Sequence, residues 1–104
     1  PDPMGATGSS MVSAVNHYKT KLDGSPSRCI AVHLIVTPEY LRTMLREHPD
    51  MIIYALRVDR GLSHPSILST VLGERWDEER GLNDHQYIVP GAGGVGELLN
   101  NAWV

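Results

Sequence analysis

Residues 2–10 read Asp2-Pro3-Met4-Gly5-Ala6-Thr7-Gly8-Ser9-Ser10 and stand immediately before the first apolar helical pattern of the chain. The two glycines allow positive φ and let a ligand approach the backbone closely. We expect the amides of Gly8, Ser9 and Ser10 to be free donors at a helix N-terminus, where the helix dipole also favours anions. The stretch therefore predicts a phosphate cradle over residues 5–10, with Asp2 placed to accept hydrogen bonds from ribose-like hydroxyls. A plain Ser/Gly helix cap is the alternative interpretation.

Two units of helix followed by strand come after this loop. An apolar stripe predicts a helix over residues 9–22, and Thr37 followed by Pro38 predicts the start of a second helix. Apolar runs at 28–36 and 51–58 predict two strands, the first of them covered on both faces. Right-handed crossovers make such strands parallel neighbours, so the predicted fold class is a doubly wound α/β sheet. The stripe of the first helix consists of Met11, Val15, Tyr18 and Leu22.

Composition excludes several classes of function. The net charge of -3 argues against a broad surface for binding a nucleic-acid backbone. No apolar run approaches the ~20 residues that cross a bilayer, and the single cysteine, Cys29, suits a reducing compartment, so we expect a cytoplasmic protein. Cys29 is expected to be buried and inert. His33, which interrupts the first apolar run, is expected to be a hydrogen-bonded core or sheet-edge residue rather than a catalytic one.

A second motif lies near the end of the chain, Gly81-Leu82-Asn83-Asp84-His85-Gln86-Tyr87-Ile88-Val89-Pro90-Gly91-Ala92-Gly93-Gly94-Val95-Gly96-Glu97. It predicts a short strand at 87–89, a tight turn at 91–96 and a terminal helix at 97–103. Ligands in α/β sheets bind beyond the carboxyl ends of the strands, so the start loop, the turn at Asp59 and the turn at 91–96 are expected to share one crevice. Backbone left bare by glycines can match the alternating acceptors and donor of a pyrimidine.

The two motifs, in this order, resemble those of uracil phosphoribosyltransferases, which are type I phosphoribosyltransferases. The resemblance covers most of the chain and leaves residues 63–80 as an expected insertion. It implies a parallel-sheet type I phosphoribosyltransferase-like fold, of which residues 1–104 are the C-terminal part. The implied reaction transfers 5-phosphoribosyl from 5-phosphoribosyl-1-pyrophosphate (PRPP) to uracil, giving UMP and pyrophosphate, with magnesium carried by PRPP.

The resemblance also implies which residues bind each substrate, without assigning a catalytic residue or a metal ligand. Gly94 stands where the family usually has Asp, which leaves catalytic competence open, and Gly5 stands where a bulkier apolar residue is expected. A non-catalytic, nucleotide-sensing regulator with the same fold is therefore the alternative function, and a nucleotide-binding domain of another α/β family ranks last. The residues implied to bind PRPP are Asp2, Pro3, Met4, Gly5, Ala6, Thr7, Gly8, Ser9, Ser10 and Gly94. Those implied to bind uracil are Ile88, Gly93, Gly94 and Val95.

The expected partners follow from the same interpretation. They are PRPP and uracil or UMP, with neither nucleic acid nor membrane. The chain begins inside the first motif, and the strand that should precede such a loop is expected to be missing. An incomplete sheet exposes edges and apolar surface, so we expect a homo-oligomer or association with the missing N-terminal portion. The chain alone is expected to have negligible transferase activity.

Overall fold

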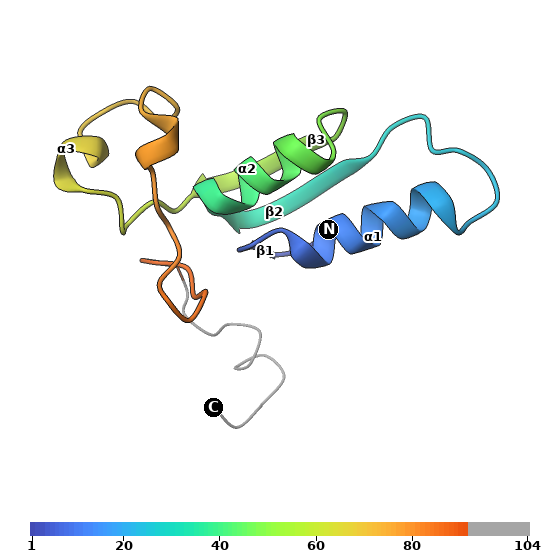
Figure 1. Ribbon diagram of the computed structural model, residues 1–104, viewed down its shortest axis with the longest axis horizontal. Helices are drawn as coiled ribbons and strands as arrows, with labels where there is room; N and C mark the ends of the chain where they lie inside the picture. The colour runs from blue at the N-terminus through green and yellow to red at the C-terminus, as the bar shows by residue number, and fades with distance from the viewer. Residues whose placement is uncertain (92–104) are drawn as a thin grey trace.

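The computed structural model describes residues 1–91, which form a three-stranded, entirely parallel sheet with both main helices on one of its faces (Figure 1). The strands are β1 (Met4–Gly5), β2 (Ile30–Val36) and β3 (Ile52–Val58), and they lie in the order β1-β2-β3. The helices are α1 (Ser9–Thr20), α2 (Pro38–Glu47) and the single turn α3 (Pro65–Leu68), followed by the 3₁₀ turn η1 (Trp76–Glu78). The α/β class and the parallel pairing predicted from the sequence are confirmed.

The strand expected to be missing before the start loop is present in the motif itself, so that prediction is wrong. Met4 and Gly5 pair in parallel with Ile35 and Val36 of β2. The Asp2 amide extends this contact by donating to the Val32 carbonyl at 3.0 Å. The first half of the motif is therefore a sheet strand, and only its second half forms a loop.

The end of β2 and the start of α2 form the core beneath the start loop. Val36, Tyr40 and Met44 are fully buried there. Thr37 begins α2 as the sequence predicts, because its hydroxyl accepts the Tyr40 amide at 3.0 Å and Pro38 follows it. Its own amide donates to the Gly5 carbonyl at 3.0 Å, so one residue caps α2 and fixes the end of β1.

The opposite face of the sheet is bare, so the prediction that the first apolar run is covered on both sides is wrong for the described part of the chain. Burial alternates along β2, with Ala31 and His33 buried and Val32 50% exposed. Both crossovers between the parallel strands place their helices on the same side, which leaves the other side without a partner. The exposed apolar residues of this face are Ile30, Val32, Leu34, Ile52, Tyr54 and Leu56.

Three smaller predictions also need correction. In the helix stripe Val15 is buried, but Tyr18 is 59% exposed and Leu22 lies beyond the end of α1. Cys29 is half-buried rather than buried. The strand predicted at 87–89 is reduced to a single antiparallel bridge between Leu82 and Ile88, because a tight turn separates the two residues. Of the turn predicted at 91–96, only residue 91 is among the described residues. The helix predicted at 97–103 lies wholly outside them.

Candidate functional site

The start loop leaves β1 and enters α1 through Gly8, which has a left-handed backbone with φ of 92°. Such a conformation favours glycine. Gly8 is the N-cap of α1, and no side chain caps the helix. The loop is anchored to the start of α2, because the Thr37 hydroxyl donates to the Ala6 carbonyl at 2.6 Å. The helix end is therefore held in place without its amides being used.

Several polar groups of this loop lack protein partners. Within residues 1–91, no hydrogen bond is made by the amides of Gly8 and Ser10. The Ser9 amide has only a long contact, 3.4 Å, to the Thr7 hydroxyl, which lies 3.1 Å from the Ser9 hydroxyl. The condition that would exclude an anion site, these amides already bonded to protein carbonyls, is absent from the described structure. Free amides at a helix start favour an anion.

A pocket of about 300 Å³ opens in front of these groups. One oxygen of the Asp2 carboxylate, Oδ1, accepts a hydrogen bond from the Met4 amide at 3.2 Å. Its other oxygen has no hydrogen-bond partner in the described chain and can accept one. The pocket is lined by Asp2, Met4, Gly5, Ala6, Thr7, Gly8, Ser10, Met11 and Tyr40.

Tyr40 and His33 support this pocket from below, and sequence analysis did not identify Tyr40. The His33 Nδ1–H donates to the Asp2 carbonyl, which can only accept, so Nε2 accepts the Tyr40 hydroxyl at 2.7 Å. Burial, together with the nearby negative charge of Asp2, raises the pKa of Tyr40 to about 12. The hydroxyl therefore stays protonated and can donate. His33 is a hydrogen-bonded core residue, as expected.

Tyr40 also explains the unusual glycine at position 5. A Cβ added to Gly5 would lie 2.9 Å from Tyr40 Cγ and 2.9 Å from Val36 Cγ1. These distances are too short for real contacts, so the tyrosine ring occupies the space of a side chain at position 5. A signal was present in the sequence, since Tyr40 is three residues after the predicted cap Thr37.

A second group of contacts fixes residues 81–91 beyond the end of β3. The carboxylate of Glu39, in the first turn of α2, accepts the Gly81 amide at 3.0 Å and the Leu82 amide at 3.3 Å. Asp59, the residue after β3, is 1% exposed, pairs with Arg57 and accepts the Gly91 amide at 2.7 Å. Two carboxylates, half-buried Glu39 and buried Asp59, thus hold the two ends of this segment.

Ile88 lies between these anchors with its backbone unused. The bridge between Leu82 and Ile88 is flanked by hydrogen bonds that join Asn83 to Tyr87 and Val89 to Gly81. Within residues 1–91 neither the amide nor the carbonyl of Ile88 makes a hydrogen bond. Ile88 as a whole, backbone included, is buried, with 4% of its surface exposed.

The start loop and the segment 81–91 follow the carboxyl ends of β1 and β3, which lie at one edge of the parallel sheet (Figure 1). Most of the start-loop residues predicted to bind PRPP line this pocket, but Pro3 and Ser9 do not, and neither does any residue of 81–91. Gly93, Gly94 and Val95 lie outside the described residues. This arrangement defines an α/β protein of the architecture in which phosphorylated ligands bind beyond the strand ends.

The uracil phosphoribosyltransferase family model matches residues 1–77, so the chain belongs to that family. It is 35% identical over 98 residues to the uracil phosphoribosyltransferase of Variovorax paradoxus (strain S110), and 36% identical over 98 residues to that of Dictyoglomus thermophilum (strain ATCC 35947 / DSM 3960 / H-6-12). Each match covers 94% of this chain and 36% of the relative. The chain thus spans about a third of the length of these relatives.

A solved structure gives the same result for the fold. The AQ2163 protein from Aquifex aeolicus superposes with a TM-score of 0.67 and 30% identity, covering 93% of this chain and 36% of that protein. The phosphoribosyltransferase-like fold expected from the resemblance is therefore confirmed. Among the described residues, no helix is both long and apolar enough to span a membrane.

Proposed function

We propose that this chain supplies the phosphate, ribose and base contacts of an enzyme that transfers 5-phosphoribosyl from PRPP to uracil, giving UMP and pyrophosphate. The observation that carries the proposal is the set of unpartnered amides at the start of α1, at the same sheet edge as residues 81–91. The names of the relatives, uracil phosphoribosyltransferase, support the choice of substrates.

In this proposal the start loop binds the phosphorylated sugar. The amides of Gly8 and Ser10 and the hydroxyls of Thr7 and Ser9 hold the 5′-phosphate, since they are donors at a positive helix end. The free carboxylate oxygen of Asp2 accepts a ribose hydroxyl. Met4, Gly5 and their neighbours contribute the backbone shape of the pocket rather than polar side chains.

The base is recognised by backbone. The free amide and carbonyl of Ile88 supply one donor and one acceptor for the edge of uracil. The roles proposed for Gly93, Gly94 and Val95 rest on the sequence motif alone.

The chemistry breaks the bond between the anomeric carbon and pyrophosphate and forms a bond to uracil N1, which loses its proton. Positive charge develops on the sugar ring, as in other glycosyl transfers. The residues described here contribute positioning of the two reactants. Magnesium enters with the substrate on its phosphate oxygens, which are the hard ligands this ion prefers.

The substitution Ser10→Asp tests the phosphate site, measured as binding of ribose 5-phosphate by calorimetry or NMR titration. Two like charges ~4 Å apart repel by about 4 kcal/mol at an effective dielectric constant of ~20, so affinity should fall at least about tenfold. An acidic residue in the first helical turn should at the same time raise the free energy of unfolding by about 0.5 kcal/mol. Loss of binding without loss of stability therefore identifies the site.

Ser13→Asp is the matched control, because it adds the same charge to an exposed serine one turn further along α1. It should leave ribose 5-phosphate binding nearly unchanged. Equal binding by wild type and Ser10→Asp would refute the phosphate site. Binding of UMP without turnover, in a protein of the relatives' full length, would instead favour the nucleotide-sensing regulator suggested by Gly94.

A further inference from the structure

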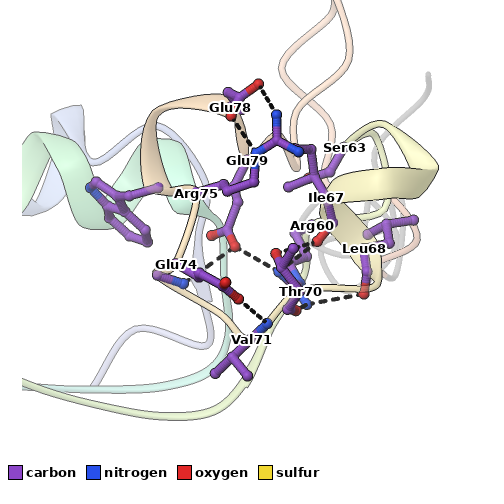
Figure 2. Close-up of polar contacts among 12 residues, drawn as sticks. Arg60, Ser63, Ile67, Leu68, Thr70, Val71, Glu74, Arg75, Glu78 and Glu79 are labelled. Carbon is purple, nitrogen blue, oxygen red and sulfur yellow. Dashed lines mark hydrogen bonds and ion pairs between the residues drawn. The ribbon is translucent and has the colours of Figure 1, made fainter.

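The segment 63–80, expected to be an insertion, is folded around a buried ion pair (Figure 2). Arg60 Nη1 lies 2.6 Å from Glu79 Oε1, and the two side chains are 18% and 0% exposed. The same carboxylate oxygen accepts the Gly73 amide at 3.3 Å. The pair therefore joins Arg60, which precedes the segment, to Gly73 in its middle and Glu79 near its end.

Arg60 also gathers the chain that follows α3. Its Nη2 donates to the Thr70 carbonyl at 2.7 Å and to the Leu68 carbonyl at 3.3 Å (Figure 2). From the sheet side, Arg42 of α2 donates to the Trp76 carbonyl at 2.9 Å and to the Glu79 carbonyl at 3.1 Å. The segment is thus fixed within itself and against α2.

The two ends of the segment meet at its base. The Leu62 amide donates to the Arg80 carbonyl at 3.0 Å, and the Arg80 amide donates to the Ser63 hydroxyl at 2.8 Å. Gly61 and Gly81, just outside these contacts, are thereby brought to the two sides of one residue.

That residue is Val89, next to the free backbone of Ile88. The Gly61 amide donates to the Val89 carbonyl at 2.8 Å, and the Val89 amide donates to the Gly81 carbonyl at 2.8 Å. The two backbones pack closely at this point, because a Cβ added to Gly61 would lie 2.6 Å from the Val89 carbonyl oxygen. The position of residues 88–91 therefore depends on how residues 61 and 81 are held.

We propose that residues 60–80 act as a brace that sets the position of the base-binding backbone at Ile88, with Arg60 and Glu79 as positioning residues. The role in base binding rests on the function proposed above. A buried ion pair contributes little net stability by itself, and Glu79 Oε2 has no partner within residues 1–91. The effect of the ion pair is to fix one geometry for residues 60–80, the geometry in which Arg60 and Glu79 are in contact.

The test compares Glu79→Gln with the matched control Glu78→Gln. Glu78 is the preceding residue, is 54% exposed, and pairs with Arg75 on the surface. Amide hydrogen exchange is measured at Gly61 and Val89, with the Thr37 amide, bonded to Gly5, as the internal reference for the start loop. Because Glu79→Gln removes the buried charge, it should speed exchange at Gly61 and Val89 by about tenfold or more and leave Thr37 unchanged. Glu78→Gln should change none of the three.

Ligand binding provides the second readout, with uracil and ribose 5-phosphate titrated separately. Glu79→Gln should weaken uracil binding and leave ribose 5-phosphate binding unchanged. Ser63→Ala, which removes the hydroxyl at the base of the segment, should give a weaker effect of the same pattern and serves if Glu79→Gln does not fold.

If neither Glu79→Gln nor Ser63→Ala changes amide exchange at Gly61 and Val89, the brace is overturned. Equal acceleration of exchange at Thr37 would also overturn it, because that result indicates general destabilisation. If Glu79→Gln speeds amide exchange at Gly61 and Val89 but leaves uracil binding unchanged, the positioning role of the ion pair is overturned. A wild-type chain that does not bind uracil would overturn the proposed base site, while the exchange measurements would still decide whether the brace exists.

Discussion

The fit between Gly5 and Tyr40 makes a quantitative prediction about the start loop. Gly5→Ala should destabilise the protein by about 2 kcal/mol, within the range for forcing an extra carbon into a packed core. The new Cβ would be 2.9 Å from both Tyr40 Cγ and Val36 Cγ1, which are held in place by α2 and β2 respectively. Gly5 is not among the positive-φ glycines, so the cost is steric rather than conformational.

A double-mutant cycle in urea tests this explanation. Combining Gly5→Ala with Tyr40→Ala removes one of the two clashes, so the pair should be less destabilising than the sum by about 1 kcal/mol. Combining Gly5→Ala with Tyr40→Phe keeps the ring and should give additive effects. Additivity within ~0.5 kcal/mol in the Tyr40→Ala cycle would refute the reasoning.

Three further predictions follow from the described contacts. The pKa of Tyr40 is raised from 10.0 to about 12, so its contribution to folding is complete below pH 10 and is lost as pH rises toward 12; urea unfolding at pH 9 and pH 11 should show a decrease in stability that Tyr40→Phe abolishes, and an equal decrease in that variant would contradict this. Glu39→Gln should weaken the hold on residues 81–82 by about 1–2 kcal/mol, measured by amide exchange, whereas the exposed Glu47→Gln should have no measurable effect. The bare apolar face should cause self-association in sedimentation equilibrium, and Leu34→Lys with Leu56→Lys should reduce it; a wild-type monomer at high micromolar concentration would rule this out.

The sequence predicted the elements whose local signals agree with their burial. Thr37-Pro38 marks the start of α2 through its capping hydroxyl and proline, and two apolar runs mark β2 and β3. The anion loop was also visible, since Gly8 at the N-cap followed by serines is a local pattern. The free amides and the pocket are what an anion site requires, and the phosphate site itself stays a prediction.

What the sequence did not predict depends on contacts distant along the chain. β1 has only two residues, too few for periodicity, and it exists because β2 pairs with it. Coverage of β2 on one face depends on which side both helices take, which apolar content cannot reveal. Tyr40 and Glu39 act on residues 35 or more positions away in sequence, at Gly5 and Gly81, and no local pattern predicts those two contacts.

The meeting of Leu62 with Arg80 has a practical consequence for protein engineering. Because the ends of the segment are joined at its base, the route from β3 to residue 81 does not depend on the length of chain between them. Val71 lies midway in sequence between Leu62 and Arg80 and is 77% exposed. New chain termini opened beside it by circular permutation, or a reporter peptide inserted there, should be tolerated, since exposed loop tips accept such changes. Arg60 and Glu79 would then hold the two sides of the cut together.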